Sequence, residues 1–203
     1  MSDKATLAAL NNQLRATAEQ QHLLDVAYRS IDTPIGQVLL AATDAGLVRV
    51  AFAIEGLEGV LQQLADQVSP RVLMAPRRLD TAASQMDRYF AGDGATFDIP
   101  LDWQLSAGYR REALHQLQQI GYGTTQSYAQ VAAATSSPRA VRAVGTACAT
   151  NPLPIVVPCH RVTRADGTRG NYRGGIAAKN FLLDLESSAA LWRSPTQQDR
   201  LIR

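Results

Sequence analysis

A cysteine stands next to a histidine and an arginine in the segment Pro158-Cys159-His160-Arg161-Val162. The thiolate form of cysteine is the nucleophile, and a neighbouring imidazole or positive charge helps a protein to generate it near neutral pH. An isolated cysteine, however, is more often a buried residue that only packs. The Cys159-His160 pair alone therefore leaves both a reactive and a structural thiol open.

The residues that lead into Cys159 restrict and bury the chain. Segment 151–158 reads Asn-Pro-Leu-Pro-Ile-Val-Val-Pro, with three prolines and a short apolar run. Segment 163–169, Thr-Arg-Ala-Asp-Gly-Thr-Arg, follows the cysteine motif and predicts a wing or loop whose arginines touch phosphates.

Short helices are predicted before the cysteine motif, and they must position it. Periodicity predicts helices over 107–120, 127–134 and 138–149, the last opening at Pro138 behind a Ser137 N-cap. Two short helices across the turn 135–137 are typical of a helix-turn-helix. Helix 138–149 is rich in small residues and carries Arg139 and Arg142, so it suits close packing against either a protein helix or DNA.

The first hundred residues predict a small α+β unit without a recognisable catalytic cluster. Strands are expected over 25–30, 37–42 and 47–52 as an antiparallel meander, because turn-rich segments separate them. Helices are expected over 56–67 and 80–91, and an extended segment over 95–102. Leu7, Leu10 and Leu14 give a weak amphipathic pattern within 4–20. A domain boundary is expected within 99–107.

Composition excludes several classes of protein. The 203 residues contain two cysteines and three histidines, which exclude a disulfide framework and a cysteine-rich zinc domain. With only two cysteines, a reducing compartment is expected. We find no signal peptide and no apolar run of membrane-spanning length, so neither secretion nor membrane insertion is expected. Residues 1–120 have a net charge of −4 and residues 121–203 a net charge of +6. Either a polyanion meets the second half, or the asymmetry arises by chance.

The full pattern around Cys159 resembles the 6-O-alkylguanine-DNA alkyltransferases, also called methylated-DNA–protein-cysteine methyltransferases. The cysteine motif 158–162, Asn151-Pro152 before it and Gly-Asn-Tyr-Arg-Gly-Gly at 170–175 carry the resemblance. It is specific over 107–186 and looser over 25–100.

The resemblance implies an α+β fold in two parts. A small N-terminal sheet-plus-helix domain of structural role, 23–102, precedes a mostly helical, winged helix-turn-helix-like DNA-binding and catalytic domain, 107–187. Residues 1–22 would be an extension and residues 188–203 a tail.

The same resemblance assigns catalytic roles. Cys159 would accept the alkyl group, His160 would act as its base through a water, and Glu186, on a helix over 177–186, would orient that histidine. Tyr128 would protonate the guanine ring, and Asn151 would tie the recognition helix to the active-site segment. Outside this pattern Glu186 reads as a solvated helix-end carboxylate, and Tyr128 as a core residue.

DNA-binding and pocket residues also follow from the resemblance. Arg142 would enter the minor groove and occupy the space of a flipped nucleotide; the other expected DNA-binding residues are Arg139, Ala140, Gly145 and Thr146. The expected alkylguanine pocket consists of Tyr128, Val162, Tyr172, Arg173 and Gly174, with the Gly174-Gly175 pair leaving space for the base. Backbone carbonyls of Cys159 and Val162 would accept from the guanine amino group, and the Arg173 amide would face the alkylated oxygen.

Two departures stand out. Many relatives have two glycines where this chain has Gly145-Thr146. The Arg173 side chain, where small residues also occur in the family, would restrict bulky alkyl groups.

The function implied is direct-reversal DNA repair, in which Cys159 takes a methyl or larger alkyl group from the 6-oxygen of guanine once per molecule. We expect no cofactor, no metal and no membrane, with alkylated double-stranded DNA as partner. We expect a monomer in the cytoplasm, or the nucleus of a eukaryote, and leave cooperative binding on DNA open. The alternatives are a non-catalytic sensor of alkylated DNA and a cysteine hydrolase using Cys159, His160 and Glu186.

Overall fold

The computed structural model describes residues 24–93 and 96–193, plus two isolated positions nearer the N-terminus, with side chains as far as 188. The amphipathic pattern of Leu7, Leu10 and Leu14 lies outside the described residues. So does segment 194–203, most of the expected tail.

A four-stranded sheet forms the first part of the chain, in the order β3-β2-β1-β4. Strand β1 (Val26–Thr33) pairs antiparallel with β2 (Gly36–Thr43), and β2 pairs antiparallel with β3 (Gly46–Phe52). The predicted meander is therefore confirmed. Strand β4 (Val72–Met74), which pairs parallel with β1, was not predicted, since three residues are too few to show a period of two.

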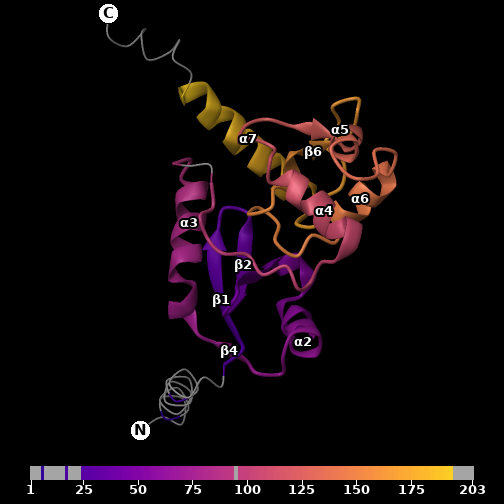
Figure 1. Ribbon diagram of the computed structural model, residues 1–203. Helices are drawn as coiled ribbons and strands as arrows, with labels where there is room; N and C mark the ends of the chain where they lie inside the picture. Colours follow the sequence, from indigo (N-terminus) through magenta and orange to yellow (C-terminus); the bar gives the residue numbers. More distant parts are fainter. Residues whose placement is uncertain (1–5, 7–16, 18–23, 94–95, 194–203) are drawn as a thin grey trace, which may run out of the picture.

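Helices cover both faces of this sheet (Figure 1). Successive side chains of a strand point to opposite faces, and two apolar clusters result. On one face Val60 and Leu64 of α2 (Leu57–Gln67) pack on residues such as Leu39. On the other face α3 (Asp80–Phe90) contributes to a core that continues into the second part of the chain. We call β1 to α3 the sheet domain and α4 to α7 the helical domain.

The connection between the domains runs along the edge of β3. The Leu47 amide donates to Pro100 O at 2.8 Å, and the Asp102 amide donates to Leu47 O at 2.8 Å. Gly46 lies at φ +138°, and a Cβ there would stand 2.3 Å from Pro100 O. Only glycine fits this close approach.

The helical domain contains α4 (Gly108–Leu117), α5 (Tyr128–Ala133), α6 (Val141–Ala149) and α7 (Gly175–Arg193). Helices α4 and α5 pack against α6. The predicted start of the third helix at Pro138 is wrong. The Ala140 amide donates to Ser137 O at 2.9 Å and closes a turn, so Arg139 and Ala140 precede α6. Residues 134–140 therefore connect α5 to α6, in place of the expected three-residue turn. Helix α7 is longer than the expected 177–186 at both ends.

A two-stranded parallel pair joins distant parts of this domain. Strand β5 (Gln126–Ser127) pairs with β6 (Val162–Thr163), which follows the cysteine motif. A capping box then starts α5: the Gln130 amide donates to Ser127 Oγ at 3.2 Å, and the Ser127 amide donates to Gln130 Oε1 at 2.7 Å. Tyr128, the first residue of α5, is thereby fixed beside the cysteine motif.

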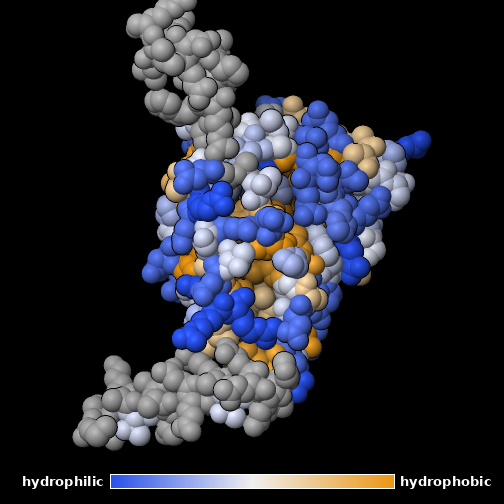
Figure 2. All heavy atoms as spheres, turned by 60° about the vertical axis from the view of Figure 1, so that its left-hand side comes forward, coloured by the Kyte–Doolittle hydropathy of each residue, from blue (hydrophilic) through white to orange (hydrophobic). Residues whose placement is uncertain are grey.

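The surface of the α3 side is mixed. Figure 2 shows hydrophilic side chains around an apolar area near the middle of this face. Among the described residues, no helix is both long and apolar enough to cross a membrane.

Candidate active site

The loop before the cysteine is organised by Asn151, which is fully buried. Its Nδ2 donates to Val157 O at 2.8 Å and lies 3.2 Å from Cys159 Sγ. Its Oδ1 accepts from the Leu153 amide at 2.9 Å. Asn151 follows α6 closely, so this side chain connects the end of that helix to the cysteine, the position that the sequence predicts for it.

Ile155 in this loop is the only non-glycine residue with a positive φ, +74°, in the part of the chain that the structure describes. A β-branched residue in this region is strained by about 1–3 kcal/mol. Its side chain is buried, and the bond from the Val157 amide to Leu153 O (2.8 Å) closes the loop around it. The packing around Cys159 thus holds a backbone shape that the sequence would not adopt alone.

Cys159 opens the 3₁₀ turn η3 (Cys159–Arg161) and is 2% exposed. Burial raises the pKa of its thiol to about 11, although the hydrogen bond from Asn151 and the charge of Lys179 act against that rise. The resting thiol is therefore protonated at neutral pH. A nucleophilic Cys159 needs a base.

His160 has the geometry of such a base. Its Nε2 lies 2.8 Å from Glu186 Oε1, while its Nδ1 is buried without a hydrogen-bond partner among the described residues. Burial lowers the pKa of His160, outweighing the hydrogen bond that its ring donates to Glu186, so the ring is neutral at pH 7. An Nε2–H donated to Glu186 leaves Nδ1 free to accept a proton.

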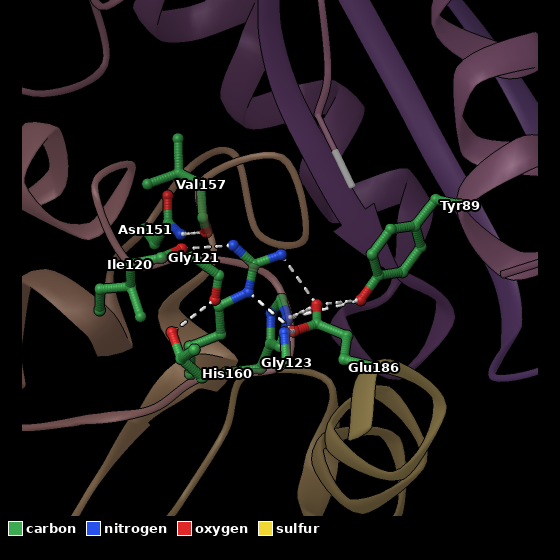
Figure 3. A network of polar contacts seen from close by, with 10 residues as sticks. Tyr89, Ile120, Gly121, Gly123, Asn151, Val157, His160 and Glu186 are labelled. Carbon is green, nitrogen blue, oxygen red and sulfur yellow. Dashed lines mark hydrogen bonds and ion pairs between the residues drawn. The ribbon is translucent and has the colours of Figure 1, made fainter. Parts of the chain in front are cut away.

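Glu186, on α7, lies at the centre of a buried polar network (Figure 3). Besides His160, it accepts from Arg161 Nε at 2.8 Å and Nη2 at 2.9 Å, from Tyr89 OH at 2.8 Å and from the Gly123 amide at 3.1 Å. Burial alone would raise the pKa of Glu186, but the hydrogen bonds from His160 and Arg161 lower it to about 2. Glu186 is therefore a permanent buried charge, not a solvated helix-end carboxylate.

Besides the Gly123 amide, two side chains of this network were not predicted from the sequence. Arg161 stands in the cysteine motif but was given no role; its Nη1 also donates to Ile120 O at 2.6 Å. Tyr89 comes from α3 of the sheet domain, and no sequence signal connects it to residues far along the chain. The orientation of Glu186 thus depends on both domains.

A cavity of about 430 Å³ opens onto Cys159. Of the expected pocket residues, Tyr128, Tyr172 and Arg173 line it, and the expected DNA-binding residue Gly145 also does. Burial raises the pKa of Tyr128, so this phenol keeps its proton. The buried hydroxyl of Tyr172 has no hydrogen-bond partner among the described residues. Five further residues were not expected in the lining: Cys148, Ala149, Arg164, Gly170 and Asn171.

Two expected pocket residues, Val162 and Gly174, are not part of the lining. The Val162 side chain is fully buried, and its carbonyl accepts from Lys179 Nζ at 2.7 Å. A Cβ at Gly174 would lie 3.0 Å from the ring of Phe52 in the sheet domain. Gly174 therefore leaves space for the neighbouring domain on this side, and its expected place in the alkylguanine pocket stays a prediction.

The five expected DNA-binding residues lie on α6 or directly before it: Arg139 and Ala140 precede the helix, Arg142 is in its first turn, and Gly145 and Thr146 are near its middle. Arg139, Arg142 and Thr146 are exposed, Ala140 and Gly145 are half-buried, and Val144 and Ala147 on the other side of the helix are buried. Within the described part of the chain neither Arg139 nor Arg142 forms an ion pair. Both guanidinium groups are thus available to a partner from outside. No group of three or more metal-ligating side chains occurs among the described residues.

The structure combines a sheet domain with a helical domain, and a buried cysteine beside a buried histidine opens onto a pocket. Comparison with known proteins gives a family. Residues 26–103 match the family described as "6-O-methylguanine DNA methyltransferase, ribonuclease-like domain", and residues 108–188 match "6-O-methylguanine DNA methyltransferase, DNA binding domain".

Individual relatives agree with these matches. The methylated-DNA–protein-cysteine methyltransferase of Mycolicibacterium paratuberculosis is 38% identical over 79% of this chain and 92% of its own length. The constitutive enzyme of Bacillus subtilis is 35% identical over 78% of this chain and 94% of its own. The chain belongs to the methylated-DNA–protein-cysteine methyltransferase family.

Solved structures lead to the same family. The crystal structure of Mycobacterium tuberculosis O6-methylguanine methyltransferase superposes with a TM-score of 0.71 at 36% identity, covering 84% of this chain and 95% of that one. The M. tuberculosis OGT structure in complex with DNA gives a TM-score of 0.68 at 36% identity, covering 80% of this chain and 94% of that one. The α+β fold expected from the sequence is confirmed.

Proposed function

We propose that this protein repairs DNA by direct reversal, moving a methyl group from the 6-oxygen of guanine to Cys159. The observation that carries the proposal is the buried thiol of Cys159 at a 430 Å³ cavity, next to a neutral histidine with one free ring nitrogen. Membership of the methyltransferase family and the DNA complex of a relative support it.

The chemistry is one in-line displacement. Sγ of Cys159 attacks the alkyl carbon while the bond from that carbon to the guanine oxygen breaks, and its electron pair stays with the base. The thiol proton passes to Nδ1 of His160 through a water, and Glu186 stabilises the imidazolium that forms. Tyr128 donates its proton to the guanine ring, so that a neutral base leaves.

The DNA must deliver the base, since the alkylated oxygen inside a duplex is out of reach. The exposed Arg142 on α6 would enter the minor groove and fill the space of the flipped nucleotide, while Arg139, Ala140, Gly145 and Thr146 lie near the groove. In this proposal residues 107–187 bind DNA and carry the chemistry, and residues 23–102 support them. We expect a monomer, acting in the cytoplasm or, in a eukaryote, in the nucleus.

The test is the intact mass of the protein after incubation with a duplex that carries one methylated guanine, followed by peptide mapping. A gain of one methyl group on the peptide with Cys159, at most once per molecule, supports the proposal, because a thioether is a very poor leaving group. Tight, damage-selective binding without a mass change would instead support a non-catalytic sensor. Repeated turnover with water as acceptor would support a hydrolase.

A further inference from the structure

Another carboxylate, Glu55, whose side chain is 9% exposed, lies where the two domains meet. It ends the 3₁₀ turn η1 (Ala53–Glu55) that follows β3. Its Oε2 accepts from Arg49 Nη2 at 2.5 Å and from Arg173 Nε at 2.5 Å, and its Oε1 accepts from the Phe52 amide at 2.9 Å. Glu55 thus joins an arginine of the sheet domain to an arginine of the candidate pocket.

The two arginines are held very differently. The Arg49 side chain is 5% exposed and also donates to Val50 O at 2.8 Å and Pro152 O at 3.3 Å. The Arg173 side chain is 26% exposed, and among the described residues Glu55 is its one ion-pair partner. The Arg49 and Glu55 side chains are therefore held in fixed positions, and Arg173 is the residue of this ion-paired group that can move.

Arg173 stands between two cavities. It lines the 430 Å³ cavity that contains Cys159, and it also lines a cavity of about 110 Å³ whose other lining residues include Arg49, Leu64 and Pro152. The Arg173 side chain is therefore a wall between the candidate alkyl pocket and empty space at the domain boundary. Glu55 sets the position of that wall.

We propose that Glu55 is a positioning residue that fixes Arg173 as a wall of the alkyl pocket, so that this chain transfers methyl in preference to bulky groups such as benzyl. The inference rests on the proposed function. A charge-assisted hydrogen bond to a nearly buried carboxylate holds the guanidinium in one geometry. Once Glu55 no longer accepts it, the partly exposed guanidinium moves into solvent, and the pocket extends toward the smaller cavity.

The experiment measures the first-order rates at which methyl and benzyl groups move from the 6-oxygen of guanine in a duplex to Cys159, by intact mass. Glu55→Gln keeps the shape of the side chain but exchanges one acceptor oxygen for an NH₂ group. We expect this variant to raise the benzyl-to-methyl rate ratio about fivefold, the factor that corresponds to the typical net contribution of one hydrogen bond, about 1 kcal/mol. Arg173→Ala removes the wall itself and should raise the ratio about tenfold.

The double variant decides whether Glu55 acts through Arg173. In the Arg173→Ala background, Glu55→Gln should leave the ratio unchanged, because the residue that it positions is gone. Asp80→Asn is the control: it removes the carboxylate from another arginine pair of the sheet domain, Arg29–Asp80 at 2.8 Å, and neither residue lines the cavity. Its ratio should equal that of the unmodified protein.

Two results would overturn the inference while leaving the proposed function intact. One is an unchanged ratio in folded Glu55→Gln that still transfers methyl; the other is a full additional effect of Glu55→Gln in the Arg173→Ala background. Arg173→Ala leaves Glu55 paired with Arg49, so it tests the wall even if Glu55→Gln fails to fold. Absence of methyl transfer by the unmodified protein, in contrast, would refute the proposed function itself.

Discussion

Among the residues that the structure describes, two carboxylates with little exposed side chain, Glu186 and Glu55, are bound to arginine, and they differ in what surrounds them. Glu186 accepts five hydrogen bonds, and its side-chain partners His160, Arg161 and Tyr89 are all buried. Glu55 accepts three, and one of its partners, Arg173, reaches solvent. A carboxylate enclosed on all sides can set the charge and orientation of a base. A carboxylate with one mobile partner can set the shape of a pocket.

The two carboxylates should therefore affect different properties of the protein. Changes at the Glu186 network should affect the rate for every alkyl group and the stability of the fold, because a buried charge left without its partner is costly. Changes at Glu55 should affect mainly which alkyl group is transferred.

The largest loss of alkyl transfer is expected when the thiol of Cys159 is replaced. Cys159→Ser should abolish alkyl transfer, because a serine hydroxyl is a far weaker nucleophile, while binding to alkylated duplex should persist. Cys148 lines the same cavity, and burial raises its pKa above that of Cys159. Cys148→Ser should therefore retain transfer when intact mass is measured. Alkyl transfer to Cys148 in the Cys159→Ser variant would contradict the assignment of the nucleophile.

Glu186→Gln should give the next largest effect. The change leaves Arg161 buried beside a neutral amide and removes the charge that stabilises the His160 imidazolium. We expect methyl transfer to slow by about 100-fold and the free energy of unfolding to fall by about 3 kcal/mol. Rapid quench-flow kinetics measures the methyl-transfer rate, and urea titration measures the free energy of unfolding. The comparison fails if Glu55→Gln reduces the methyl rate by as much as Glu186→Gln does.

Acid should act on the Glu186 network in two ranges of pH. The lowered pKa of His160 means that the transfer rate stays level at neutral pH and falls about tenfold per pH unit once the pH is below that pKa, itself below 6.5. Stability declines in the range just above it: between pH 6.5 and the lowered pKa of His160, the unfolded state takes up a proton that the folded state does not.

The carboxylate titrates at lower pH. Glu186 has a folded pKa of about 2 and an ordinary value of 4.5, so its contribution is complete above pH 4.5 and is lost as the pH falls through about 2. In urea titrations at several pH values, Glu186→Gln should lack this second decline. A decline of equal size in the variant would assign it to other carboxylates.

Tyr89→Phe should have the smallest effect. It removes one neutral donor to Glu186 and leaves the ring packed in the core, so we expect a loss of about 1 kcal/mol in stability and a methyl rate within about fivefold of normal. The methyl-transfer rate and urea titration again measure these two effects. A much larger loss of rate would show that the sheet domain takes part in the chemistry and would remove the distinction between the two carboxylates.

Local sequence patterns predicted most of the fold. Period-two runs gave the meander, and helical periodicity gave α2, α3, α4 and α5. The start of α6 was misplaced because Ser137-Pro138 has the residue types of a helix N-terminus, yet the chain makes a separate turn there. Strand β4 forms because it pairs with β1, and a segment of three residues is too short for its sequence to predict that pairing.

The candidate site was predictable where its residues are close in sequence or fit a family pattern. Cys159, His160 and Asn151 lie within ten residues, and the structure places all three beside the same cavity or its supporting loop. Tyr89 and Glu55 were missed because their contacts span 97 and 118 residues, and no local signal reports such contacts. Gly174 was interpreted as space for a ligand, because sequence alone does not show that Phe52 occupies that side.

The burial of Cys159 has a consequence for a protein that is consumed by its own reaction. Every molecule oxidised or alkylated by a small reagent in solution would be lost before it met DNA. With a pKa of about 11, only about 1 in 10,000 of these thiols is ionised at pH 7, and 2% exposure admits few electrophiles. The low intrinsic reactivity of this sulfur therefore preserves each molecule for the one electrophile that fits the cavity.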